Sequence, residues 1–225
     1  MSAEKTDSVI LSVTPYRETS CILRLFTHTH GLVHGIAKGA RGGGKSSTPL
    51  DRGFLLESLL YYKPNRELHT LGFPHVTNFF PAIRSDITKS ALRDVALELY
   101  LKSITQSEPH PELFELLVSF LTGMEESSER EALFPLLWQF IHNYCMIAGF
   151  GIDIDGGDVR GGEGAWEGGG IDEIVVKAIR DIDGGRGRRY HRGEALRITE
   201  LLLLYCRAHF DIRTSFNSLE FLRTV

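Results

Sequence analysis

The chain contains little cysteine and no long apolar run. Its three cysteines, Cys21, Cys145 and Cys206, are odd in number, far apart and never in a C-x-x-C pair. That distribution argues against a disulfide framework and against a cysteine zinc site. The most apolar run, residues 201–206, is far shorter than the roughly 18 residues of a membrane span, and the first residues lack the apolar core of a signal peptide. These absences predict a protein of the reducing cytoplasm, without membrane contact.

The formal net charge of −4 conceals a difference between the two parts of the chain. Residues 1–80 contain nine Lys and Arg residues against six Asp and Glu residues, whereas residues 81–225 contain sixteen against twenty-three. A weakly basic part followed by an acidic part indicates two separate tasks. Chance variation in surface charge is the alternative interpretation.

The first 75 residues have the alternating apolar pattern of short strands. In residues 21–27, Leu23 and Leu25 share one face, whereas Arg24 and Phe26 share the other. Similar segments lie at residues 9–13, 32–38, 54–62 and 68–73. Five short strands with no room for helices between them predict a small antiparallel barrel or sandwich.

From about residue 86 the apolar pattern changes to a helical period. Apolar stripes lie at residues 92–99, 113–121, 133–144, 171–182 and 194–208. The third helix is predicted to open with a capping box from Ser128 to Glu131 and to stop at Gly149 or Gly151. Nine of the twenty residues 151–170 are glycine, which predicts a flexible insertion. We therefore expect an α+β chain with a β domain at residues 1–80 and a helical domain at residues 81–225.

Residues 39–46 match the phosphate-binding loop pattern G-x-x-x-x-G-K-[ST]. That loop needs a helix that begins at its lysine, because the helix N-terminus and the loop amides hold the phosphates. Here Pro49 and Gly53 follow Lys45 too closely for a helix of useful length. The sequence therefore predicts a basic glycine loop between two strands, and no nucleotide hydrolase.

Three cations cluster at this loop, at and beyond the end of a predicted strand. They are Lys38, Arg41 and Lys45, and Arg24 and Arg17 are expected to extend the patch. Cations that follow the phosphate backbone are how small barrels bind single strands. We predict that these five residues bind DNA. The alternative is a solvated loop whose charge keeps the protein soluble.

A second group of cations lies near the last long helix. Arg186, Arg188 and Arg189 are neighbours of Tyr190 and of several glycines. They are a possible second contact to nucleic acid. Alternatively, they form the charged approach to the following helix.

No catalytic or metal-binding grouping stands out. His28, His30 and His34 surround a predicted turn, where a solvated hairpin explains them better than a metal site. The acidic segment at residues 153–158 lacks the twelve-residue loop and terminal Glu of a calcium site. We expect neither an enzyme nor a bound metal or cofactor.

Seven short segments follow one another between Tyr16 and Leu71. They are Tyr16-Arg17-Glu18-Thr19, Phe26-Thr27, His30-Gly31, Ala37-Lys38-Gly39-Ala40-Arg41, Lys45-Ser46, Tyr61-Tyr62 and Leu68-His69-Thr70-Leu71. Their order and spacing resemble the N-terminal domain of RecO-type recombination mediators. The helical half is similar to that family more loosely, through residues 140–151 and the closing segment 218–222.

The resemblance implies an OB-fold barrel followed by a helical domain, in a protein of DNA repair and homologous recombination at the bacterial nucleoid. It implies binding of single- and double-stranded DNA and annealing of complementary strands. It also implies work with RecR, and often RecF, to load recombinase onto DNA coated by single-strand-binding protein. Lys38 and Arg41 match basic positions of the family's DNA-binding barrel. An OB-fold adaptor that binds only protein is the alternative.

The sequence departs from the family in two places. Many relatives have a four-cysteine zinc module after the third helix, where this chain has the cysteine-free residues 153–170, so no thiolate is present to hold zinc. Some relatives also have an arginine in the third helix that receives the acidic C-terminal tail of single-strand-binding protein. Trp138 stands in that region here. We expect Trp138 to line a groove for the tail and Arg130 to supply the cation.

Overall fold

The computed structural model describes residues 3–41, 49–105, 107–152, 173–185 and 188–225. The chain forms two compact units, one of residues 1–81 with 104–121 and one of residues 82–103 with 122–225. Residues 104–121 thus group with the first unit, whereas the sequence interpretation placed them in the helical domain. Most of the predicted glycine-rich insertion, residues 153–170, lies outside the described residues.

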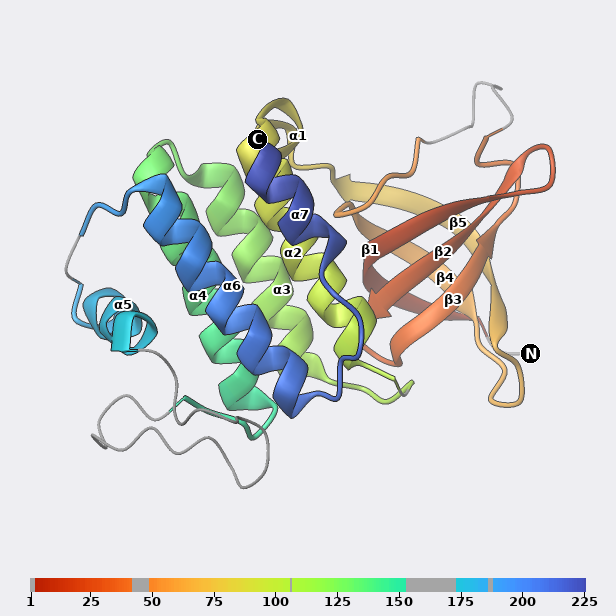
Figure 1. The fold of residues 1–225 in the computed structure, drawn as a ribbon. Coiled ribbons are helices and arrows are strands. Elements are labelled where there is room, and N and C mark those ends of the chain that lie inside the picture. The colour runs from red at the N-terminus through yellow and green to blue at the C-terminus, as the bar shows by residue number, and fades with distance from the viewer. Residues whose placement is uncertain (1–2, 42–48, 106, 153–172, 186–187) are drawn as a thin grey trace. The chain divides into compact units, whose positions relative to one another are not determined.

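The first unit contains a closed five-stranded barrel, which confirms the predicted barrel (Figure 1). Its strands are β1 (Glu4–Tyr16), β2 (Ser20–Thr27), β3 (Gly31–Ala37), β4 (Leu55–Tyr61) and β5 (Leu68–Asn78). They close in the order β1-β2-β3-β5-β4. All neighbouring strands are antiparallel except β3 and β5, which are parallel. Because direction cannot alternate around a ring of five strands, one pair must be parallel.

The barrel is closed by the long first strand, which pairs with β4 through its first half and with β2 through its second half. A bulge between Ile10 and Ser12 interrupts the pairing of β1 with β2, and such bulges bend a strand and increase its twist. Side chains from all five strands fill the interior. They are Ile10, Cys21, Leu23, Leu25, Val33, Ala37, Leu56, Leu60 and Leu71, with Phe54 just before β4.

The start of helix α3 (Pro111–Glu126) packs on the outside of the barrel. Phe26 points outward from β2, and its ring lies 6.4 Å from that of Phe114. Gly31 has a φ of +63°, and a Cβ atom there would collide with the carbonyl of Glu108. The close approach of these backbones therefore requires glycine at the turn between β2 and β3.

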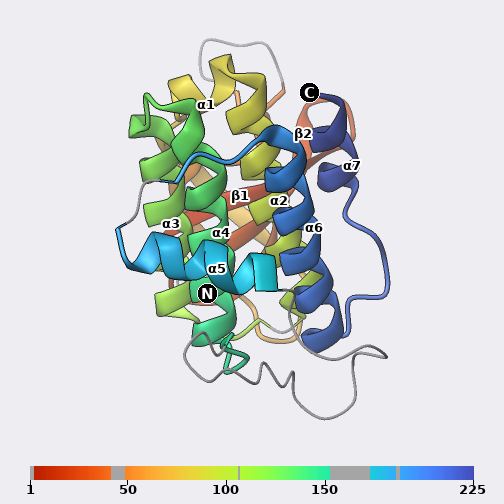
Figure 2. The same cartoon turned by 60° about the vertical axis from the view of Figure 1, so that its left-hand side comes forward.

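The second unit is helical. Its elements are α1 (Pro81–Ser85), α2 (Ile87–Ser103), the last turns of α3, α4 (Arg130–Ile147), α5 (Glu173–Asp183), α6 (Arg192–His209) and α7 (Asn217–Thr224). Helix α5 lies across α4 and α6, and α7 packs on α2 (Figure 2). The large buried rings of Tyr100, Trp138 and Tyr144 form part of its core.

The ends of α4 test two local predictions. The predicted capping box is wrong, because the helix begins at Arg130 and the residue before it, Glu129, makes no side-chain cap hydrogen bond. The later start leaves Ser128 outside the first turn. At the other end, Gly149 has a φ of +83° and directly follows Ala148, the C-cap of the helix, which confirms the predicted glycine stop.

No helix among the described residues is long and apolar enough to cross a membrane. In the same parts of the chain, no three His, Cys, Asp or Glu side chains lie close enough together to hold a metal ion.

Candidate nucleic-acid interface

Three of the predicted DNA-binding cations surround one end of the barrel. Arg17 lies in the β1–β2 turn with a φ of +53°, and its guanidinium lies 5.2 Å from the ring centre of Tyr16. Lys38 directly follows β3 and is exposed. Arg41 is also exposed, and its backbone N–H donates a hydrogen bond of 2.9 Å to the carbonyl of Thr19. This bond ties the β3–β4 connection to the β1–β2 turn, so the fold gathers the three cations at one end.

Arg24 continues these cations along the outside of the barrel. It lies on β2, opposite His34 of β3, and its neighbours Leu23 and Leu25 point inward. Outward positions alternate along β3, so Lys38 faces the same side as His34. Four residues of strand span about 13 Å at about 3.3 Å per residue. Arg24, His34 and Lys38 therefore follow one line on the outer face of β2 and β3.

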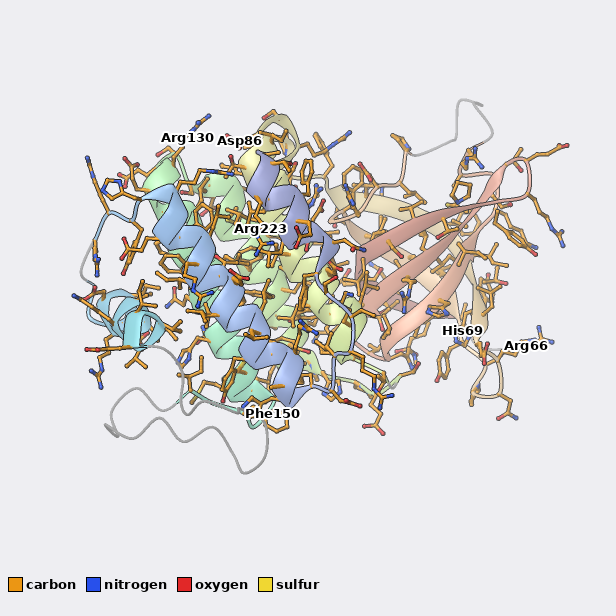
Figure 3. The ribbon with its side chains drawn as sticks, in the orientation of Figure 1. Arg66, His69, Asp86, Arg130, Phe150 and Arg223 are labelled. Atoms are coloured by element: carbon orange, nitrogen blue, oxygen red, sulfur yellow. The ribbon has the colours of Figure 1, made fainter. Side chains whose placement is uncertain are left out.

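The opposite end of the barrel carries two cations that the sequence interpretation left without a role. Lys63 and Arg66 lie in the β4–β5 connection, where the exposed Arg66 projects away from the barrel (Figure 3). The ring of Tyr62 stacks on His69 at 4.6 Å and on His30 at 4.1 Å, which fixes the start of this connection. The sequence gives little indication of a role for Lys63 and Arg66, because they are two cations in a loop that also contains Glu67.

Burial controls the charge of the histidines on this surface. It lowers the pKa of His34, the positive charge of Arg24 lowers it further, and Glu67 opposes the shift. Burial likewise lowers the pKa of His69, with added repulsion from His30 and His34. His34 and His69 are therefore neutral at pH 7, and the positive charge of this face comes from its lysines and arginines.

Two predicted contacts lie outside the described residues. They are Lys45, with most of the loop that matches the phosphate-binding pattern, and Arg186.

The remaining arginines of the second predicted patch differ from each other. Arg188 donates a hydrogen bond of 2.8 Å to Glu194, lies 4.0 Å from Asp181, and its guanidinium lies 4.9 Å from the ring centre of Tyr190. These contacts favour the interpretation of Arg188 as part of the charged approach to α6. Arg189 is exposed, and its contact to nucleic acid stays a prediction.

The helical unit contains an open pocket beside Arg130. Its volume is about 250 Å³, and it is lined by Thr88, Arg130, Glu131, Phe134, Tyr190, Arg192 and Ala195. The Arg130 side chain is 84% exposed and approaches Asp86 at 3.7 Å (Figure 3). Aromatic walls and two guanidinium groups fit a ligand that has both an apolar side chain and a negative charge.

Trp138 does not line this pocket, so its predicted place in a surface groove is wrong. The side chain is completely buried, and its indole N–H donates a hydrogen bond of 2.9 Å to Thr199. Its ring centre lies 4.8 Å from that of Tyr190 and 6.2 Å from that of Phe134. Trp138 therefore supports the two rings that do line the pocket.

Two family models match the chain, and together they cover well over half of it. The model described as "Recombination protein O N terminal" matches residues 1–79, and the one described as "Recombination protein O C terminal" matches residues 84–161. The chain belongs to the RecO family. The matched segments cover the whole barrel and most of the helices up to the end of α4.

Curated RecO proteins show the same relationship. The DNA repair protein RecO of Geobacter metallireducens is 29% identical over 155 residues, which are 69% of this chain and 62% of that protein. That of Syntrophus aciditrophicus is 32% identical over 59% of this chain and 51% of its own length. That of Anaeromyxobacter dehalogenans is 30% identical over 59% of this chain and 52% of its own length. The matched part of this chain thus spans between about half and 62% of the length of these RecO relatives.

Proposed function

We propose that this chain binds single-stranded DNA along the outer face of its barrel and anneals complementary strands in DNA repair and recombination. The observation that carries the proposal is the line of cations from Arg17, Lys38 and Arg41, which lie at one end of the barrel, to Arg24 on the outer face of β2. Such a line follows a phosphate backbone without reading the sequence. Membership of the RecO family supports the same function.

Annealing of this kind needs no covalent chemistry. Two complementary strands repel each other through their phosphates, and pairing lowers their free energy once they meet. A protein that neutralises the phosphates with lysine and arginine releases counterions and lets the strands approach. We propose that the chain acts in this way at the nucleoid, without nucleotide hydrolysis or a bound cofactor.

The direct test is an annealing assay with two complementary oligonucleotides, one of them labelled, with and without ATP. We expect the full chain to accelerate pairing equally in both conditions. Annealing that requires ATP, or ATP hydrolysis that disappears in Lys45→Ala, would show that the glycine loop is a nucleotide site. A chain that neither binds nor anneals DNA at low salt would refute the proposed function.

We also propose that the pocket beside Arg130 receives the acidic, apolar C-terminal tail of single-strand-binding protein. Phe134 and Tyr190 provide apolar contact for a side chain of the tail, and Arg130 and Arg192 provide cations for its carboxylates. Through this contact, and with RecR and RecF as partners, the chain would deliver recombinase to coated DNA.

A second candidate is an adaptor that binds protein through its barrel without contacting DNA. Phe73 favours it, because this ring is 84% exposed at a bulge in β5, with a φ of +48°. Exposed aromatic rings are typical of protein interfaces. Binding to single strands that weakens steeply with salt would separate the two candidates, because an adaptor without DNA contact shows none.

A further inference from the structure

Arg24 and His34 are direct neighbours on the outer face of the barrel. They oppose each other in the antiparallel pairing of β2 and β3, where opposing Cβ atoms lie about 4.5–5.5 Å apart. The Nε atom of Arg24 is buried and has no hydrogen-bond partner among the described residues. A buried N–H group without a partner is uncommon and calls for an explanation, such as a ligand. Arg24 therefore has one unused donor in the free protein, on the strand directly opposite His34.

The charged and titratable groups around His34 come from three parts of the barrel. Arg24 faces it from β2, Glu67 from the β4–β5 connection, and His69 from β5. In the free protein, burial and Arg24 keep the pKa of His34 below its usual value, although Glu67 opposes the shift. The imidazole is thus neutral at pH 7, with one nitrogen that donates and one that only accepts.

We propose that Arg24 and His34 form a subsite for one phosphodiester of the bound strand, and that His34 takes up a proton when this subsite is filled. The inference rests on the proposed function and adds a residue and a pH dependence to it. A phosphodiester carries one negative charge and accepts hydrogen bonds. It pairs with the guanidinium of Arg24, and a protonated His34 donates to it from either ring nitrogen.

The sign of the pH dependence follows from the two states of His34. A nearby negative charge favours the protonated imidazole, so the pKa is higher in the complex than in the free protein. Binding takes up a proton when the pH lies between these two pKa values. The affinity therefore rises as the pH falls through this interval and becomes constant below the pKa of the free protein. A rise of one pKa unit in the complex corresponds to about a tenfold gain in affinity.

The test measures binding of the full chain to a labelled oligothymidine by fluorescence anisotropy between pH 8.5 and 5.5 at constant ionic strength. We expect the affinity of the wild-type chain to rise about tenfold as the pH falls, because a pKa of His34 that is about one unit higher in the complex corresponds to this factor. His34→Gln should keep binding but lose most of this rise. His75→Gln is the matched control, because His75 is an exposed histidine elsewhere on the barrel, on β5. A rise that persists unchanged in His34→Gln would overturn the inference.

A second measurement avoids dependence on a variant that fails to fold. The pKa of His34 is read by NMR from its ring protons in the wild-type chain, alone, with the oligothymidine and with inorganic phosphate. We expect the oligothymidine to raise this pKa by about one unit, as one close opposite charge does. No change in the presence of bound DNA would overturn the inference. An equal rise with the same concentration of inorganic phosphate would overturn the assignment of the subsite to DNA.

Different results would contradict DNA binding by the barrel and proton uptake by His34. A folded chain that binds no oligothymidine at any pH contradicts the proposed function. A chain that binds it with the same affinity at every pH contradicts only the role of His34.

Discussion

Removal of Lys38 and Arg41 together should reduce both the affinity for single-stranded DNA and the dependence of that affinity on salt. Both side chains are exposed at the same end of the barrel, and neither makes an ion pair within the described parts of the chain. Among the described residues, the hydrogen bond of Arg41 is donated by its backbone N–H, to the carbonyl of Thr19. The double variant Lys38→Ala with Arg41→Ala should therefore fold normally, so that lost binding reports lost contacts.

The size of the effect follows from counterion release. Each phosphate contact with a single strand contributes about 0.7 to the slope of log affinity against log salt, so two lost contacts reduce the slope by about 1.4. From about 50 to about 200 mM salt, the affinity deficit of the variant should shrink about sevenfold. An effect that came from misfolding would not shrink in this way.

The assay is a set of anisotropy titrations of a labelled oligothymidine at several salt concentrations. The control is the double variant Lys177→Ala with Arg213→Ala, which removes the same charge from exposed positions of the helical unit. We expect the control to keep the wild-type slope. If the barrel variant keeps it too, while the control loses slope, DNA binds to the helical unit and our assignment is wrong.

Three further outcomes are expected. Arg130→Ala should weaken binding of a labelled acidic tail peptide to the full chain about tenfold. This is the low end for a charge-assisted contact, because the Arg130 side chain is 84% exposed. Unchanged affinity would mean that another cation binds the carboxylates of the tail. Elemental analysis should find well under one zinc per chain, and a chelator should leave the melting temperature unchanged, because no cysteine lies in residues 153–170. Glu98→Gln should lower the free energy of unfolding by about 2 kcal/mol at pH 7, since this carboxylate accepts hydrogen bonds from the first turn of α7.

The effect of Glu98→Gln should depend on pH in one direction. Burial would raise the pKa of this carboxyl, but hydrogen bonds from Ser218 and Asn217 and the charge of Lys102 keep it below its usual value. A lowered pKa means that the stabilisation is present above the pKa of the unfolded chain and is lost as the pH falls through that of the folded chain. Wild type and variant should therefore converge in melting temperature in acid. A difference that stays constant down to low pH would contradict this role of Glu98.

The barrel could be predicted from the sequence because its information is local. Alternation of apolar residues marks all five strands, and each of them forms near the expected position. The parallel pairing of β3 with β5 and the bulge in β1 could not be predicted, because both result from closing the ring. The long helices were likewise visible as apolar stripes.

The short helices α1 and α7 were missed for a related reason. The backbone N–H groups of Ala82 and Ile83 donate to the carboxylate of Glu125, more than forty residues away. Those of Asn217 and Ser218 donate to Glu98, about 120 residues away. Caps of this kind leave no signal in the neighbouring sequence, because local rules look for a capping residue directly before the helix.

The residues of the candidate site also differ in how far the local sequence predicts their position. Lys38 and Arg41 could be found because they are exposed cations in one loop, but the place of Trp138 could not. An aromatic residue on an apolar stripe is equally consistent with a core position and with a groove. Trp138 lies in the core because its indole N–H donates a hydrogen bond to Thr199, which is 61 residues away in the sequence. Before that contact is known, either interpretation satisfies the pattern.

His34 is the clearest case of a residue whose meaning depends on register. In the sequence it belongs with His28 and His30 around a predicted turn. In the barrel its side chain points outward beside Arg24, since β2 and β3 pair with these two residues opposite each other. A slip of one residue would turn His34 into the apolar interior. Arg24 opposes protonation of His34 in the free protein, so the imidazole beside it stays neutral at pH 7. The same arrangement suits an anion, which removes that opposition when it binds.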